Sequence, residues 1–190
     1  MFAVVLDTCV LWPSLQRDFL LSLAVEGLYR PLWSSVILDE LNYHESQKLV
    51  DRGVPVGEAA SRAEALVAQM AEHFDDARVE GWEPLEGTFH LPDPNDEHVL
   101  AAAVMGGAGA IVTENLKDFP KRAVPNHIDV VPAKQFAYET ALVDPQRALA
   151  AVQQIAARWR RPRRTVDEVL DALRANYGMG EAVDLMSDVL

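Results

Sequence analysis

Acidic side chains stand next to the apolar segments of this sequence, where the strands of a buried sheet would end. Asp7 directly follows the apolar run of residues 2–6. Glu40 borders the apolar face of a predicted helix, whereas its neighbour Asp39 points away from that face. Asp96 lies on the apolar face of another predicted helix. In parallel α/β sheets the functional site forms where strand carboxyl ends meet helix amino ends, so these acids are candidates for one site.

A polar segment after the predicted strand of residues 110–113 adds further oxygen donors. Thr113, Asn115 and Asp118 lie within this segment. Asp93, upstream in the sequence, is interpreted mainly as the cap of the helix that follows it. Each of these residues alone is equally suited to satisfying turn or cap groups of the backbone, so the prediction depends on their combination.

Converging carboxylates predict a metal site. Three or four ionised carboxylates do not share a small space without a cation, because like charges raise one another's pKa. With oxygen donors, a single cysteine and no usable histidine cluster, the set suits Mg²⁺ or Mn²⁺ rather than zinc. Such an ion polarises a phosphoryl oxygen and activates water, so the pattern predicts hydrolysis of phosphodiester bonds.

Three nearby side chains are predicted to have structural roles. His44 shares the apolar face of its helix and is expected to be packed or hydrogen-bonded there, whereas His98 is expected to point outward. Cys9 is expected to be a small core residue beside the strand end, because no histidine–cysteine arrangement for nucleophilic catalysis is visible.

The elements that would position these residues alternate between strand and helix. The predicted strands cover residues 2–6, 29–34, 77–82, 110–113 and 128–131. The predicted helices between and after them cover residues 14–27, 35–52, 56–74, 94–105 and 132–142. This alternation predicts an α/β fold with three α/β/α layers, in which helices cover both faces of a central parallel sheet of about five strands.

Residues 144–190 carry helix signals and no strand signals. Asp144 is placed to cap the first of these helices, and Thr165 with Glu168 forms a capping box at the start of another. We therefore predict two units, a nuclease-like domain in residues 1–143 and a helical C-terminal extension in residues 144–190.

Composition excludes several classes of protein. The single cysteine rules out a disulfide scaffold and a cysteine-ligated structural zinc site, and it indicates a reducing compartment. The longest apolar stretch, residues 99–112, is too short for a membrane helix, and the first residues lack the features of a signal peptide. The 190 residues with 49% hydrophobic content suit a well-cored globular protein, which we expect to be cytoplasmic.

Four motifs in order along the chain carry a resemblance to a known family. They are Val5-Leu6-Asp7-Thr8, Ser34-Ser35-Val36-Ile37-Leu38-Asp39-Glu40-Leu41, Asp96-x-x-Val99-Leu100-Ala101-Ala102-Ala103, and Ile111-Val112-Thr113-x-Asn115 with Asp118-Phe119. Together they resemble the PIN-domain nucleases, especially the VapC-type toxins of bacterial toxin–antitoxin pairs, over about residues 1–140. The resemblance implies a PIN-like fold, a Mg²⁺- or Mn²⁺-dependent endoribonuclease activity on RNA, a cognate antitoxin that silences it, and homodimers of the kind common in the family.

The resemblance also assigns roles to residues at matching positions. It implies three principal catalytic and metal-ligating acids: Asp7, Glu40 and Asp96. Thr113 corresponds to the hydroxyl residue at the end of a strand that supports the catalytic site. Asn115 stands where many relatives carry a fourth aspartate, so a second metal would be held more weakly unless Asp93 or Asp118 substitutes.

Charge is distributed unevenly along the chain. There are 17 lysines and arginines against 29 aspartates and glutamates, a net charge of −12, which opposes bulk attraction to nucleic acid. Five arginines nevertheless form one cluster: Arg158, Arg160, Arg161, Arg163 and Arg164. Their guanidinium groups are candidates for binding the RNA backbone, with a solvated linker or a docking surface for an acidic partner as open alternatives.

Two other classes of function stay open. The first is a PIN fold kept for RNA or protein contacts without chemistry, which Asn115 in the fourth acidic position favours. The second is a haloacid-dehalogenase-like phosphatase, which also places an aspartate after its first strand. That pattern needs a second acid two residues later, where this chain has Cys9.

Overall fold

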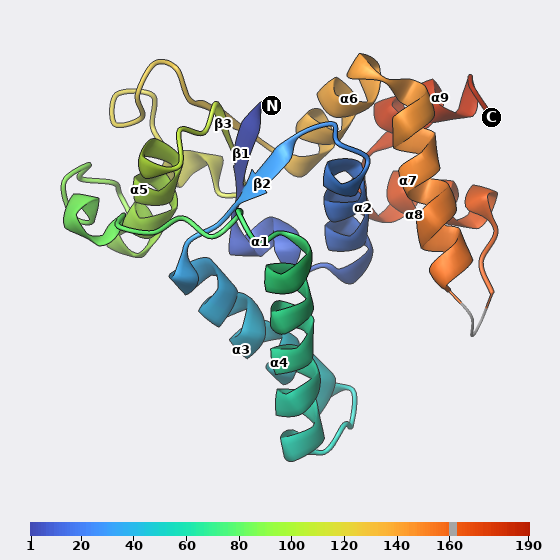
Figure 1. Ribbon diagram of the computed structural model, residues 1–190, viewed down its shortest axis with the longest axis horizontal. Coiled ribbons are helices and arrows are strands. Elements are labelled where there is room, and N and C mark those ends of the chain that lie inside the picture. Colours follow the sequence, from blue (N-terminus) through green and yellow to red (C-terminus); the bar gives the residue numbers. More distant parts are fainter. Residues whose placement is uncertain (160–162) are drawn as a thin grey trace.

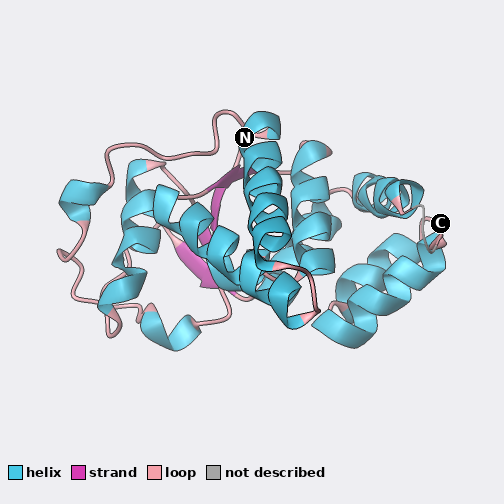
Figure 2. Ribbon diagram, turned by 90° about the horizontal axis from the view of Figure 1, so that it is seen from below, coloured by secondary structure: helices cyan, strands magenta, loops and turns pink. Residues whose placement is uncertain are grey.

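A four-stranded parallel sheet forms the centre of the computed structural model, which describes residues 1–159 and 163–190. The strands are β1 (Ala3–Leu6), β2 (Arg30–Leu32), β3 (Ala110–Val112) and β4 (Asp129–Val131), in the spatial order β2-β1-β3-β4. Helices flank this small sheet (Figure 2). The α/β class is therefore confirmed, with four strands among the described residues rather than about five.

The two central strands are buried along their whole length. Every residue of β1 and β3 is buried, as expected for continuous apolar runs in a parallel sheet covered on both faces. Val5 is in register with Leu32 on one side and with Ile111 on the other. This shared register brings the carboxyl ends of β1 and β3 to the same edge of the sheet.

The predicted strand of residues 77–82 is wrong as a strand. Only a single parallel bridge forms there, between Trp33 and Arg78. The pairing stops because its partner turns away, since Ser34 already caps the next helix. Beyond the bridge, Gly81 takes a left-handed conformation with φ of 72° and redirects the chain.

Six α-helices accompany the sheet in the first part of the chain. They are α1 (Thr8–Leu11), α2 (Ser14–Val25), α3 (Ser35–Asp51), α4 (Val56–His73), α5 (Glu97–Met105) and α6 (Ala133–Val143). Three short 3-10 helices are η1 (Glu83–Leu85), η2 (Pro94–Asp96) and η3 (Leu116–Asp118). Helix α5 packs on β1 and β3, whereas α3 and α4 pack on each other and project away from the sheet (Figure 1). Residues 94–96, predicted as the first turn of a longer helix, form η2.

The last part of the chain is helical, as predicted. It comprises α7 (Pro145–Arg158), α8 (Val166–Tyr177) and α9 (Gly180–Ser187). The Asp144 carboxylate caps α7, and Thr165 and Glu168 form both hydrogen bonds of the capping box of α8. Helix α7 packs against α2 and α6 as well as against α8 and α9 (Figure 1). A domain boundary after residue 143 stays a prediction.

None of the helices in the described part of the chain has the length and the apolar character that crossing a membrane requires.

Candidate active site

Asp7 and Thr113 meet at the carboxyl ends of the two central strands. Both side chains are buried, and Thr113 Oγ1 donates a hydrogen bond to Asp7 Oδ2 at 2.6 Å. The backbone holds the pair in line, because the amide of Asp7 donates to the carbonyl of Val112 at 3.1 Å. Thr113 Oγ1 also accepts from the amide of Asn115 at 3.0 Å. One oxygen of Asp7 is thus fixed by an uncharged hydroxyl rather than by a cation.

Cys9 lies against this pair, which sequence reasoning missed. Its Sγ is 3.1 Å from Asp7 Oδ2 and 3.4 Å from Thr113 Oγ1, and it accepts from the amide of Glu114 at 3.2 Å. The side chain packs against the core but is only partly buried, so the expectation of a core residue is partly met. Burial, and then the charge of Asp7, raise the pKa of the thiol to about 12, so Cys9 is a neutral donor to Asp7.

Glu40 is the partly buried acid of α3, and Asp39 is exposed, as the helical periodicity predicts. Thr8 Oγ1 in α1 donates to Glu40 Oε2 at 2.6 Å. Burial raises the pKa of Glu40, but the nearby His98 imidazole and the hydrogen bond from Thr8 outweigh it, so the pKa lies below its usual range. Glu40 is therefore held as a carboxylate. Thr8 belonged to the first sequence motif, and only the fold reveals its partner.

His98 is buried beside Glu40, so the expectation that it points outward is wrong. Only 3% of the residue is exposed, its Nε2 lies 3.7 Å from Glu40 Oε1, and its Nδ1 lies 3.0 Å from Ser34 Oγ. The periodicity misled because α5 is covered on both sides, and Ala101 and Ala102 are fully buried as well. The Trp82 ring, from the segment before η1, is tilted against the imidazole of His98, with 6.1 Å between the ring centroids.

His44 is exposed, so its expected place on the packed face of α3 is also wrong. The buried row of this helix runs instead through Leu41 to Glu45. Glu45 is buried because it forms ion pairs with Arg17 and Lys48. The ion-paired Glu45 occupies a buried position where the periodicity favours an apolar residue. The buried face of α3 therefore includes Glu45 and leaves out His44.

Asp96 lies at the junction of η2 and α5 and makes no side-chain cap hydrogen bond. Asp93 does the capping, as predicted, because its carboxylate accepts from the amide of Asn95 at 2.9 Å. Burial, followed by the charges of Asp7, Asp93 and Asp118, raises the pKa of Asp96 to about 6. These carboxylates therefore act on one another electrostatically across the strand ends.

The donor set at the strand ends suits a divalent cation in chemistry and charge. Within the described residues, none of the carboxylates of Asp7, Asp93, Asp96 and Asp118 forms an ion pair with lysine or arginine. In the same part of the chain, no three histidine, cysteine or acidic side chains are drawn together to ligand distance. Asn115 is exposed at the start of η3. A hard cation would relieve the mutual repulsion that raises the pKa of Asp96.

Glu97, next to Asp96, has a structural role that sequence reasoning missed. Its carboxylate is buried and accepts from the amides of Gly87, Phe89 and Leu91 at 3.0, 3.1 and 2.8 Å. These three hydrogen bonds fasten the loop that precedes η2 and so fix the approach to Asp96. The local sequence carried no signal for them, because the amides belong to an irregular loop.

The predicted arginine cluster is only partly described. Arg160 and Arg161 lie outside the described residues. Arg158 donates to Ser22 Oγ in α2 at 2.9 Å, so it joins two helices of the fold. The guanidinium of Arg164 stacks 3.9 Å from the Trp159 ring, and Arg163 is exposed. The structure therefore gives Arg158 a packing role and leaves Arg163 facing solvent.

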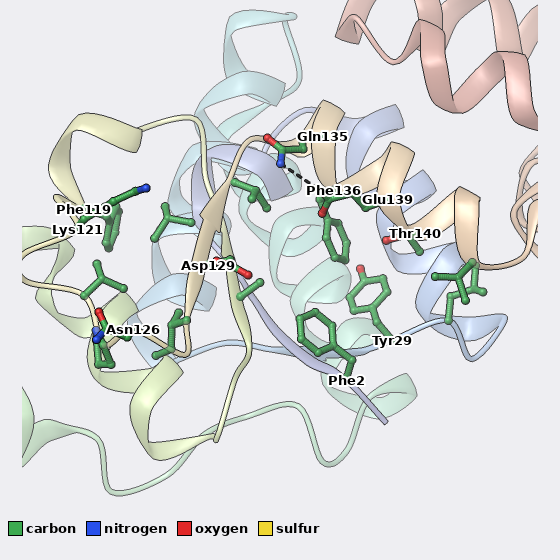
Figure 3. A pocket seen from close by; sticks show the side chains of 18 residues that line it. Phe2, Tyr29, Phe119, Lys121, Asn126, Asp129, Gln135, Phe136, Glu139 and Thr140 are labelled. Atoms are coloured by element: carbon green, nitrogen blue, oxygen red, sulfur yellow. Dashed lines mark hydrogen bonds between the residues drawn. The ribbon is translucent and has the colours of Figure 1, made fainter.

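A groove of about 850 Å³ lies away from the acids, between β4 and α6 (Figure 3). The Tyr29 hydroxyl at its wall already donates to the carbonyl of Leu20 at 2.8 Å, and Gln135 donates to Glu139 at 2.9 Å. None of the candidate acids lines this groove. This groove and the acidic side chains at the carboxyl ends of the strands are therefore separate features.

Comparison with known families gives two matches along the chain. Residues 3–117 match the family model described as PIN domain, and residues 140–188 match the one described as VapC50 C-terminal domain. No curated protein and no solved structure matches the chain. The first match spans Asp7, Glu40, Asp96, Thr113 and Asn115, whereas Asp118 follows it.

Proposed function

The chain belongs to the PIN-domain family and carries a VapC50-type C-terminal domain, and we propose that it is a Mg²⁺- or Mn²⁺-dependent endoribonuclease, the toxin of a toxin–antitoxin pair. The observation that carries the proposal is that hydroxyl groups orient two of the acids: Thr113 Oγ1 donates to Asp7, and Thr8, next to Asp7 in the chain, donates to Glu40. Burial, and then the charge of Asp7, raise the pKa of Asp96 to about 6, so Asp96 senses the charge of Asp7 as well.

Asp7, Glu40 and Asp96 would hold the cation. Bound there, a divalent ion polarises a phosphoryl oxygen and makes water a better nucleophile. Thr113 keeps Oδ2 of Asp7 in place, and Thr8 keeps Oε2 of Glu40 in place. These uncharged donors orient the carboxylates without neutralising them, so their negative charge is kept for the cation.

Because Asn115 stands in the fourth acidic position, we expect one tightly bound cation. An amide oxygen can ligate Mg²⁺ but brings no charge, so a second cation at this end of the sheet would be held weakly. Asp118 in η3 and Asp93 before η2 are the acids that would strengthen such a second position. Both already contribute to raising the pKa of Asp96.

Partners follow from the same family assignment. We propose that a cognate antitoxin protein keeps the enzyme silent in the cytoplasm, and that the protein forms homodimers. The arginines between α7 and α8 are proposed to bind the RNA backbone, because the acidic body of the protein repels phosphate. Among the described ones, Arg163 and Arg164 serve this role better than Arg158, which donates to Ser22.

Cleavage of mixed total RNA by the purified protein tests the proposal. We expect cleavage with Mn²⁺, none with EDTA, and a loss of at least about 100-fold in the Asp7→Asn and Asp96→Asn variants, since each removes a ligand charge. Asp39→Asn, which removes an exposed acid next to Glu40, is the matched control and should cleave normally.

Two outcomes would redirect the assignment. A folded protein that binds Mn²⁺ but cleaves no RNA in any lane would contradict the nuclease and favour a binding module. Release of phosphate from a phosphomonoester by the wild-type protein, lost in Asp7→Asn, would favour the phosphatase reading instead.

A further inference from the structure

His98 is a buried polar residue in a helix that is apolar from Val99 onward. Its neighbours in α5 from Val99 to Ala103 are all fully buried, and the histidine itself is 3% exposed. Burying an imidazole is unfavourable unless both nitrogens find partners. Nδ1 lies 3.0 Å from Ser34 Oγ, within hydrogen-bond distance, and Nε2 faces the Glu40 carboxylate at 3.7 Å from Oε1, within ion-pair distance.

The contacts with Ser34 and Glu40 together favour a proton on Nε2, because the Glu40 carboxylate that faces this nitrogen can only accept a hydrogen bond. Ser34 Oγ accepts from the amide of Ile37 at 3.1 Å as the cap of α3, so its own hydrogen is free to be donated to Nδ1 of His98. The proton of the neutral ring is then on Nε2, the nitrogen that faces Glu40. In the doubly protonated ring Nε2 carries a proton too, so the imidazole presents an N–H to the carboxylate in both forms.

Glu40 is consequently restrained through both of its oxygens. Thr8 Oγ1 donates to Oε2 at 2.6 Å, and His98 faces Oε1 at 3.7 Å. The Glu40 side chain is 39% exposed, and a glutamate this free would lose rotamer entropy when it binds a cation. Two donors on opposite oxygens remove part of that cost beforehand, since the carboxylate is already oriented.

A packing role alone does not account for the imidazole. Ser34 caps α3 through Ile37 without help from the ring, and the five residues that follow His98 in α5 are buried and apolar. What the ring adds is an N–H aimed at Glu40. Residues that orient a metal ligand in this way typically change metal affinity about 10- to 100-fold when they are replaced.

We propose that His98 is a positioning residue of the active site, which uses Ser34 to direct its Nε2–H at Glu40 and so fixes this carboxylate for the cation. The inference rests on the proposed function, because it assumes that Glu40 is a ligand. The positioning role of His98 is limited to Glu40, because Asp7 is oriented by Thr113 and Cys9.

Two amide substitutions separate the two contacts of the ring. His98→Gln places an amide nitrogen near the position of Nε2 and can still donate to Glu40, whereas His98→Asn reaches only the position of Nδ1 and Ser34. We expect His98→Asn to weaken Mn²⁺ binding to the RNA-free protein about 10-fold or more, and His98→Gln to remain close to wild type. Electron paramagnetic resonance of free Mn²⁺ measures both affinities, and thermal unfolding of the metal-free variants checks that each is folded.

A double-mutant cycle with Glu40→Gln completes the test. In the Glu40→Gln background, His98→Asn should no longer change Mn²⁺ affinity, because the carboxylate through which it acts is gone. The proposal is overturned if His98→Asn binds Mn²⁺ like wild type, if Gln and Asn lose affinity equally, or if the loss persists in the Glu40→Gln background. A wild-type protein that binds no Mn²⁺ would instead contradict the proposed function itself.

Discussion

The carboxyl end of the sheet and the C-terminal helices are built in opposite ways. At the sheet end, the hydrogen bonds Thr113–Asp7, Ser34–His98 and Thr8–Glu40 join residues 106, 64 and 32 positions apart. In the C-terminal helices, the ends are set by contacts three residues apart, such as those of Thr165 with Glu168. Local contacts therefore set where these helices begin, whereas the site exists only once the whole fold is assembled.

The two regions also differ in what their polar groups do for stability. At the sheet end, burial and then the charges of Asp7, Asp93 and Asp118 raise the pKa of Asp96, so ionising this group there is unfavourable. The C-terminal helices bury apolar rows, including Leu149, Val152 and Ile155 of α7. Stability is thus given up at one end of the molecule and supplied at the other, a division common where a site must hold a charge for its ligand.

The largest expected effect comes from comparing substitutions of the adjacent acids Glu97 and Asp96. Glu97→Gln should lower the free energy of unfolding by about 2–3 kcal/mol, because the charge that strengthens the three hydrogen bonds is lost and the amide nitrogen of glutamine faces at least one backbone N–H donor. Asp96→Asn, the matched control, should leave the metal-free protein as stable as wild type or more so, since it removes a repelling charge. Urea unfolding without metal measures both, and a large loss in Asp96→Asn would show that Asp96 belongs to the fold.

The arginines sharpen the comparison by testing whether the helical region takes part in RNA binding. Replacing Arg163 and Arg164 by alanine should weaken RNA binding several-fold and reduce the slope of log affinity against log salt by about one to two. Arg52→Ala with Arg62→Ala removes the same charge from the far end of α3 and α4 and serves as control. Fluorescence anisotropy at several salt concentrations measures the slopes. Equal slopes in the two variants would leave the cluster as a linker or protein-docking surface.

The smallest expected effect is on a helix cap. Thr165→Ala should lower the free energy of unfolding by about 1 kcal/mol, because it removes the side-chain acceptor for the amide of Glu168. Thr165→Ser keeps the hydroxyl and should match wild type, and neither change should alter Mn²⁺ affinity. If Thr165→Ala did weaken Mn²⁺ binding, the two regions would be energetically coupled and the contrast drawn between them would fail.

Sequence reasoning succeeded where the signal was local. Apolar runs located the four strands, and cap residues such as Ser34 and Asp144 located helix starts within a residue or so. It also picked the acid of α3 that faces the body, Glu40. The α/β class and the family follow from such local patterns taken in order.

The errors share one physical cause, which is burial imposed from outside the segment. His98 is inside because Trp82 and its segment cover α5, and His44 is outside because Glu45 is buried through ion pairs with distant residues. Cys9 takes part in the site because Thr113 arrives beside it from a strand more than one hundred positions away. None of these contacts can be inferred from the periodicity of the segment that contains the residue.

Helix α2 packs on β2 on one side and on α7 and α8 on the other. Most of its residues from Leu15 to Ala24 are buried, and Arg158 reaches Ser22 from the end of α7. The helix is therefore a wall shared by the PIN domain and the C-terminal helices. Substitutions on either side of that wall constrain each other during evolution, so the two parts of such a toxin should be inherited as one unit rather than exchanged between relatives.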